Sequence, residues 1–245
     1  MNRIAPSRRK RRLAEVAQVA SAGLLLSSLL SGCGVGAATP VPEPPALQTD
    51  KITIPAMIAV LGNSLTLQGA AGTAPARATI LVTDLDATTA SVATTAADDG
   101  SFAITVPTNA GDEQRLVALV EGVRSLPFDF KALNNAIVAS PRPACLSVTP
   151  ELLVSVRAGS KANFKFENAC AGVVTLQAPR SRTGDAAVGF DAQFTASIVS
   201  GASATFSVNV ASGAAPTLDE VVFVDVAVDG QTIRYPLGVY AGSER

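Results

Sequence analysis

The amino-acid sequence predicts an all-β fold, with two tandem β-sandwiches that follow an N-terminal signal helix and a proline-containing tether. Alanine, valine, threonine, serine and glycine dominate the composition and tryptophan is absent, which is typical of strands and turns. Short segments alternate apolar and polar residues with a period of two, so each has one apolar face. About 210 residues follow the predicted signal, which is enough for two domains of about 100 residues each.

Residues 1–32 have the three parts of an export signal. Six Lys and Arg side chains precede Leu13, with only Glu15 to oppose them. An uncharged, mostly apolar run over residues 19–30 is followed by the small residues Ser31 and Gly32. A basic segment, a short apolar segment and a small-residue exit are the pattern of a secretory signal. The apolar run is too short to span a bilayer, because a membrane-spanning helix needs about 20 apolar residues.

The tetrapeptide Leu30-Ser31-Gly32-Cys33 closes this signal and resembles the lipobox of bacterial lipoproteins. The resemblance implies that the signal is cut before Cys33, that the Cys33 thiol carries diacylglycerol and that the new amino group is acylated, with palmitate as the expected chain type. One acyl chain anchors only marginally and stable anchoring takes two signals, so the resemblance implies a firmly anchored lipoprotein. The alternative is an ordinary signal peptide with an incidental cysteine. Ser7-Arg8-Arg9 also resembles a twin-arginine signal, which leaves the export route open.

Residues 33–50 contain four prolines and no hydrophobic period, which predicts a partly extended tether. In polyproline-like form, at about 3.1 Å per residue, it reaches at most ~50 Å. Gly34 follows the predicted lipid cysteine, and by resemblance to enterobacterial lipoproteins a residue other than aspartate there favours the outer membrane. We therefore expect an exported protein anchored to the cell envelope, facing the periplasm or the cell surface.

The formal net charge of −1 conceals an uneven distribution. Of 19 basic and 20 acidic side chains, six basic residues and Glu15 lie in residues 1–32, so the mature chain keeps 13 basic and 19 acidic side chains and a charge of −6. No basic patch survives processing, which argues against a nucleic-acid partner. The chain also has no histidine, the commonest general base and metal ligand.

Residues 51–132 form the first predicted sandwich, from about seven short alternating runs separated by turn residues. Asp99-Gly100 lies between the runs 90–95 and 101–106 and predicts a hairpin, because glycine accepts positive φ. The apolar faces of the runs are Leu65 and Leu67; Ile80 and Val82; Phe102, Ile104 and Val106; Leu116, Ala118 and Val120; and Phe128 and Phe130.

Pro141 and Pro143 mark a predicted linker over residues 133–143, and residues 144–241 form the second predicted sandwich. The alternating valines from Val222 to Val228 share one apolar face, and Asp229-Gly230 predicts the tip of a second hairpin. Cys33 would be used by the lipid, which leaves two cysteines. An even remainder in an exported chain predicts a disulfide, here between Cys145 and Cys170.

Several segments resemble known modules. Ala78-Thr79-Ile80-Leu81-Val82 and Ala97-Asp98-Asp99-Gly100-Ser101-Phe102 resemble bacterial Ig-like and carboxypeptidase-regulatory-like modules. Asn168-Ala169-Cys170, residues 201–206 and Asp229-Gly230, in that order, resemble Hydin-type and other Ig-like domains. These resemblances imply two tandem Ig-like β-sandwiches of the non-catalytic kind that serve exported proteins as spacers and binding modules.

Asp84, Asp86, Asp98 and Asp99 are the acidic cluster that could hold a cation, since calcium takes about six to eight oxygen ligands. Aspartates at strand ends also serve as turn residues that accept backbone N–H bonds, and no calcium-loop spacing accompanies these four. We therefore predict turns and no metal site. Aromatic residues that alternate on a strand are usually core, so we assign three phenylalanines to the core rather than to a sugar-binding face: Phe164, Phe166 and Phe206.

No catalytic residue and no cofactor are predicted. Without histidine, a serine nucleophile would need a lysine or an acidic base, and Lys51, Lys131, Lys161 and Lys165 lie outside nucleophile motifs. The expected function is a non-catalytic binding, adhesion or scaffolding module that contacts the membrane through its lipid and an unidentified envelope protein or glycan. The alternatives are an accessory subunit that binds polysaccharide or cell wall, which an exposed aromatic row would support, and a hydrolase with a paired serine and lysine or two carboxylates in a pocket.

Overall fold

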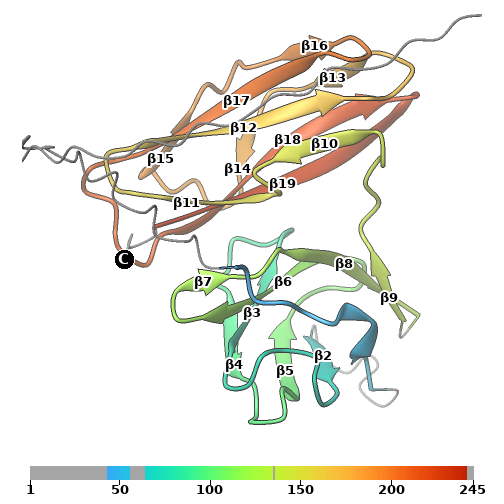
Figure 1. Ribbon diagram of the computed structural model, residues 1–245, viewed down its shortest axis with the longest axis vertical. Coiled ribbons are helices and arrows are strands. Elements are labelled where there is room, and N and C mark those ends of the chain that lie inside the picture. Colours follow the sequence, from blue (N-terminus) through green and yellow to red (C-terminus); the bar gives the residue numbers. More distant parts are fainter. Residues whose placement is uncertain (1–42, 56–63, 135, 242–245) are drawn as a thin grey trace, which may run out of the picture. The chain divides into compact units, whose positions relative to one another are not determined.

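The hairpin predicted at Asp229-Gly230 joins two interior strands of a sheet. Strand β18 (Asp219–Val228) pairs along its whole length with β19 (Gln231–Ala241). Asp229 and Gly230 have φ values of 49° and 76°, the positive pair that a two-residue hairpin turn of this type requires. The computed structural model describes residues 43–55, 64–134 and 136–241 (Figure 1), which belong to one compact unit over Pro42–Arg245.

The strands of the second sandwich form two sheets. One sheet has the order β10-β12-β17-β15, and the other has the order β11-β19-β18-β13-β16, with β14 also paired to β18. Besides β18 and β19, the strands are β10 (Leu146–Thr149), β11 (Leu153–Val156), β12 (Lys161–Asn168), β13 (Val174–Leu176), β14 (Arg180–Ser181), β15 (Val188–Phe190), β16 (Ala196–Ile198) and β17 (Ser203–Val210).

This strand order defines an Ig-like sandwich. β10, β12, β17 and β15 occupy the places of strands A, B, E and D, while β19, β18 and β13 occupy those of G, F and C. The chain changes sheet between β10 and β11, because β10 pairs antiparallel with β12 and β11 pairs parallel with β19. The predicted fold of this domain is therefore confirmed.

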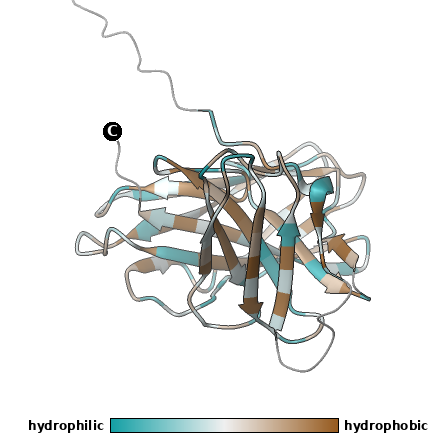
Figure 2. Ribbon diagram, turned by 90° about the horizontal axis from the view of Figure 1, so that it is seen from below, coloured by the Kyte–Doolittle hydropathy of each residue, from teal (hydrophilic) through white to brown (hydrophobic). Residues whose placement is uncertain are grey.

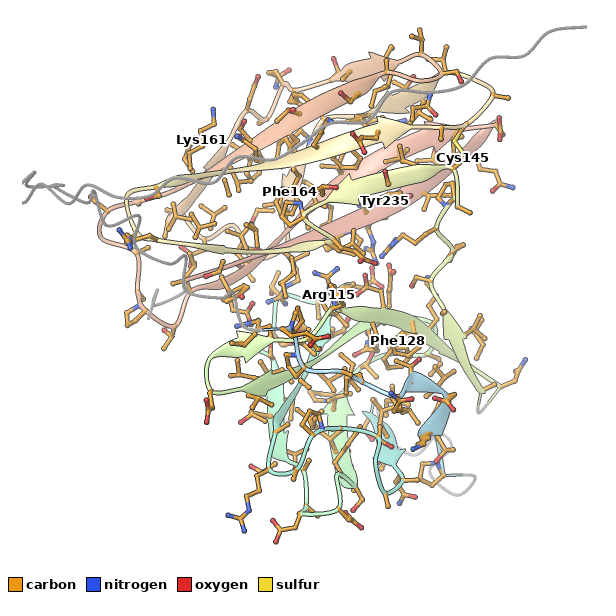
Figure 3. All side chains as sticks on the ribbon, in the orientation of Figure 1. Arg115, Phe128, Cys145, Lys161, Phe164 and Tyr235 are labelled. Atoms are coloured by element: carbon orange, nitrogen blue, oxygen red, sulfur yellow. A yellow bond between two sulfur atoms is a disulfide. The ribbon has the colours of Figure 1, made fainter. Side chains whose placement is uncertain are left out.

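The core of the second sandwich consists of the apolar faces that the alternation predicted. Phe164, Phe166 and Phe206 are at most 1% exposed, so they are core residues and do not form an aromatic surface. Phe164 and Tyr235 lie between the two sheets (Figure 3), and hydrophobic and hydrophilic residues alternate along the strands (Figure 2).

The first sandwich also has two sheets, and all of its strand pairs are antiparallel among the described residues. The strand orders are β1-β2-β5 and β4-β3-β6-β8-β9, and β7 pairs with the end of β6. Its core contains the predicted faces, with Leu67, Ile80, Leu116 and Phe130 fully buried. Its elements are the 3-10 helix η1 (Thr49–Lys51), β1 (Ile52–Thr53), β2 (Ser64–Gly69), β3 (Thr79–Asp84), β4 (Val92–Thr95), β5 (Phe102–Pro107), β6 (Glu113–Val120), β7 (Val123–Arg124), β8 (Phe128–Leu133) and β9 (Ala136–Ala139).

The hairpin predicted at Asp99-Gly100 is wrong, because the turn is a corner between the two sheets. β4 pairs with β3, whereas β5 pairs with β2. Gly100 has a φ of 80°, and a Cβ on it would lie 2.1 Å from the backbone oxygen of Ala74. Glycine is required here both for its backbone conformation and for the close contact with a neighbouring loop.

The range 133–143, predicted as a linker, contains a strand. β9 pairs with β8 in register Leu133↔Ala136 to Phe130↔Ala139 and so extends the sheet of the first sandwich. Residues 140–143 lie between β9 and the turn that starts the second sandwich, where Leu146 N donates to Pro143 O at 3.0 Å.

Candidate functional site

The predicted lipidation site lies outside the described residues. Leu30, Ser31, Gly32 and Cys33 all fall in the range 1–42, so lipidation stays a prediction. Over the described residues, the structure contains no helix with the length and apolar character needed to cross a membrane.

A disulfide joins the other two cysteines, as predicted. It links Cys145, just before β10, to Cys170, just after β12, across a sequence separation of 25 residues. Asn168 orders the adjacent loop, since its Nδ2 donates to the backbone oxygens of Gly172 and Ile198 and its Oδ1 accepts from Cys170 N. The disulfide therefore lies beside a buried hydrogen-bond network at one end of the sheet.

The acidic cluster is separated into two groups by the length of β3. Asp84 is the last residue of this six-residue strand, which spans about 20 Å, and Asp86 lies just after it, while Asp98 and Asp99 lie in the corner beside its start. Asp98 pairs with Arg77, and Asp99 accepts from Ser101 N. The four carboxylates therefore do not converge on one site, and no group of three acidic or cysteine side chains in the described ranges is arranged to hold a metal ion.

Charged side chains from both sandwiches meet in a network that we call the junction. It includes four arginines and three carboxylates, and none of its contacts was predicted from the sequence. The members are Asp86, Glu113, Arg115, Asp129, Arg142, Arg182 and Arg234.

Arg115 on β6 forms the most buried ion pair of the junction. Its Nε and Nη2 donate to the two carboxylate oxygens of Asp129 on β8 at 2.7 and 2.9 Å, and the two side chains are 4% and 3% exposed. Nη2 also donates to the backbone oxygen of Pro236 on β19 at 2.5 Å. Paired, charge-assisted hydrogen bonds of this kind are among the strongest in proteins. Arg115 thus links a strand of the first sandwich to one of the second.

Asp129 has a second arginine partner in the segment between the sandwiches. Arg142 Nη2 donates to Asp129 Oδ2 at 2.5 Å, and Arg142 Nη1 donates to the backbone oxygen of Arg234 at 2.8 Å. The Arg142 guanidinium also lies 4.9 Å from the ring centroid of Tyr235. One carboxylate therefore balances two arginines, and both arginines reach β19.

Arg234 on β19 forms the complementary contact from the second sandwich. Its Nη2 donates to Glu113 Oε2 at 2.6 Å, and its Nη1 donates to Asp86 Oδ1 at 2.6 Å. Asp86 Oδ2 accepts from the backbone N–H of Glu113 at 2.7 Å. The two acidic groups are held together by a backbone hydrogen bond and share one arginine.

Other contacts between the two sandwiches are an ion pair between Arg124 on β7 and Asp219 on β18 at 2.9 Å, an arginine that binds a loop of the first sandwich, and a small apolar cluster. Arg182, just after β14, donates through Nη1 to the backbone oxygens of Ala87 and Thr89 at 2.8 and 2.9 Å, and burial lowers the pKa of its guanidinium. The apolar residues are Leu85, Val221 and Phe223, all at most 4% exposed. The junction therefore covers the faces of β6 and β18 that point away from the cores of their own sandwiches.

The junction makes a prediction about acid stability. Burial by itself would raise the pKa of Asp86, but the hydrogen bonds from Arg234 and from Glu113 N, with the nearby positive charges, bring that pKa below its ordinary value. A depressed pKa means that the contribution of Asp86 is fully present above the unfolded-state pKa of about 3.9 and is lost as pH falls through the folded-state pKa. In urea unfolding, Asp86→Asn should therefore destabilise the protein at pH 7 and have a smaller effect at pH 2.5.

The matched control is Asp50→Asn, which removes an exposed carboxylate and should have little effect at either pH. An Asp86→Asn penalty of equal size at pH 7 and pH 2.5 would show that the charge of Asp86 contributes nothing.

Comparisons with known proteins leave the family open. No family model and no curated protein matches the sequence. Among solved structures, similarities include the PapD-like domain 7 of human CEP192 (12% identity, 46% of this chain and 99% of that one, TM-score 0.30), an E. coli alpha-2-macroglobulin (12%, 74% and 16%, 0.27) and the Vibrio cholerae VesB protease (10%, 69% and 63%, 0.33). The chain thus spans less than two thirds of the second and third of these. Similarities this low carry no argument about function.

Proposed function

We propose that the protein is an exported, lipid-anchored and non-catalytic module of the cell envelope, in which two Ig-like sandwiches act as a binding, adhesion or scaffolding unit. The signal predicted over residues 1–32, the lipobox-like tetrapeptide that ends at Cys33 and the tether predicted over residues 33–50 support the anchor and the envelope location, with the outer membrane favoured.

The hydrogen bond from the buried Arg115 to the backbone oxygen of Pro236 is the observation that most supports a scaffolding role. Contacts between domains of one chain ordinarily permit relative motion unless the interface is large and apolar. Here, separation would leave Arg115 without Pro236 O and Arg234 without both of its carboxylates. Removing one partner from a buried charge is strongly unfavourable. A two-domain unit held in this way suits a protein that presents a binding surface at a distance from the membrane.

The described residues give less support to the two alternatives, an accessory glycan-binding subunit and a hydrolase. A glycan-binding face would need exposed aromatics, but Phe164, Phe166 and Phe206 are buried. A hydrolase would need an activated nucleophile, whereas Lys165 pairs with Glu167 at 2.5 Å and Lys51 donates to Gly72 O. A non-catalytic role therefore accounts best for the described residues.

Replacing Cys33 tests the anchor. Cys33→Ser removes the thiol that would carry diacylglycerol, so we expect the variant to remain an uncut or unlipidated precursor that leaves the detergent-extracted membrane fraction. The wild type should stay in that fraction after a high-salt wash and carry lipid mass on its N-terminal peptide. Cys170→Ala is the matched cysteine control and should still fractionate with membranes. Equal membrane retention of Cys33→Ser and wild type, with no lipid mass on either, would contradict the proposal.

A further inference from the structure

Strand β10 has one open edge. Its only strand neighbour among the described residues is β12. Cys145 O accepts from Ala169 N, and Asn168 N donates away from β10 to Ala202 O. Because backbone bonds alternate along an antiparallel pair, residues 147 and 149 bond to β12, and residues 146 and 148 direct their backbone groups outward. Leu146 N is already used by Pro143 O, so the open groups are Leu146 O and both groups of Val148.

In contrast to the edge of β10, the edge of β19 has its outward backbone oxygens at Arg234 and Pro236 occupied by arginine side chains. β11 pairs with the last four residues of β19. In the part of β19 that precedes them, the outward backbone oxygen of Arg234 accepts from Arg142, and that of Pro236 accepts from Arg115. Pro236 has no N–H to offer to another strand. Proteins commonly block exposed strand edges in these ways. The edge of β10 is short, with four residues, but among the described residues no side chain occupies the outward groups of Val148 or the carbonyl of Leu146.

A cavity of about 550 Å³ lies beside the open edge of β10. Binding pockets for small groups typically have volumes of about 300–1,000 Å³, mostly apolar walls and a few polar atoms. Leu146, Val148 and Leu152 supply apolar side chains. The polar lining residues are Arg142, Ser147, Thr149, Glu151 and Tyr235. Leu146 is 6% exposed whereas Ser147 is exposed, so alternate side chains of β10 face the interior and the solvent.

Tyr235 lines the cavity, and its buried hydroxyl has no hydrogen-bond partner among the described residues. Buried hydroxyl groups are ordinarily satisfied. Burial raises the pKa of this hydroxyl to about 12, so it remains a hydrogen-bond donor at neutral pH. The hydroxyl oxygen is shielded from solvent, so an acceptor on a bound segment would satisfy it once neighbouring side chains, such as Arg142 over the ring, move aside.

We propose that the edge of β10 binds an extended peptide segment of a partner protein as an added strand. The segment pairs with the open backbone groups of Leu146 and Val148, places one uncharged aliphatic side chain in the cavity, and offers an oxygen to the Tyr235 hydroxyl. Strand addition takes its affinity from main-chain hydrogen bonds and its specificity from pockets for alternate side chains. This inference deepens the proposed binding role and names its site and partner class.

The test uses the full-length protein in detergent and a pooled library of capped octapeptides, randomised at four central positions. We expect the retained peptides to be enriched in an aliphatic residue at one position, with alternating small polar neighbours. For the most enriched peptide, N-methylation of the backbone should weaken binding at least ten-fold at alternate positions and have little effect between them. Because N-methylation changes the peptide and not the protein, this result does not depend on whether a protein variant folds correctly.

Two protein variants complete the test. Val148→Pro removes an open N–H and should abolish retention, whereas Ala139→Pro, at an outward-facing position of the edge strand β9, should not. Tyr235→Phe should weaken binding about five-fold, the loss of one hydrogen bond, and leave the melting temperature unchanged or raised.

Retention that is equal in wild type and Val148→Pro, or the absence of any enriched peptide, would overturn the proposal. Displacement of the peptide by N-acetylglucosamine oligomers, without an effect of N-methylation, would also overturn it and assign the cavity to a glycan. Neither outcome depends on Cys33, so failure of this inference is distinct from failure of the anchor.

Discussion

Replacing Asp129 by alanine is expected to destabilise the folded protein by about 3–5 kcal/mol, the usual loss when one partner of a buried ion pair is removed. The Asp129 carboxylate accepts three hydrogen bonds, two from Arg115 and one from Arg142. Its side chain is 3% exposed and that of Arg115 is 4% exposed. The substitution therefore leaves a buried guanidinium without its counter-charge. Urea unfolding at neutral pH, followed by far-UV circular dichroism, measures the loss.

Glu167→Ala is the matched control, because it also breaks an ion pair of one carboxylate and one cation. The Lys165–Glu167 pair is about half exposed on both sides, so its loss should cost less than about 1 kcal/mol. A loss for Asp129→Ala no larger than that of Glu167→Ala would show that the junction contributes little to stability.

The strands of both sandwiches could be predicted because their cores follow a period of two. Val222, Val224 and Val226 are fully buried on one face of β18, and Phe164 and Phe166 are fully buried on one face of β12. Alternation of this kind is a local property of the sequence. It requires no knowledge of which strand lies next to which.

Pairing between strands was less predictable. Asp-Gly turns occur at both residues 99–100 and 229–230, yet one is a sheet-to-sheet corner and the other a hairpin. Local turn chemistry is the same at the two positions. The difference is that β4 pairs with β3 and β5 pairs with β2, so β4 and β5 do not pair with each other. This choice of partners depends on contacts between residues distant in sequence.

The junction could not be derived from local pattern either. Arg234 and Glu113 are separated by 121 residues, as are Arg115 and Pro236. The available signal was an apolar residue on the second face of each of two strands. Val117 lies between the core residues Leu116 and Ala118 of β6, and Phe223 lies between the core valines of β18. Such residues indicate a covered second face without identifying what covers it.

Removing the disulfide is the second change with a large expected effect. Cys145 and Cys170 close a loop with a sequence separation of 25 residues, and the chain-entropy model gives about 3 kcal/mol of stabilisation for a loop of this length. The double variant Cys145→Ala/Cys170→Ala should lose roughly that amount in urea unfolding. Wild type treated with a thiol reductant should lose a similar amount, because both changes remove the same constraint from the unfolded chain.

The reductant supplies the control within this experiment. The double alanine variant has no bond to break in the sandwich, so its stability should not change when reductant is added. Cys170 is 3% exposed and packs in the core, so any further loss in the double variant beyond that of reduced wild type measures the missing sulfur contacts. Mass spectrometry of a non-reduced tryptic digest should contain the linked peptides. Two free thiols in protein purified from the envelope, with a stability that reductant does not alter, would contradict the disulfide.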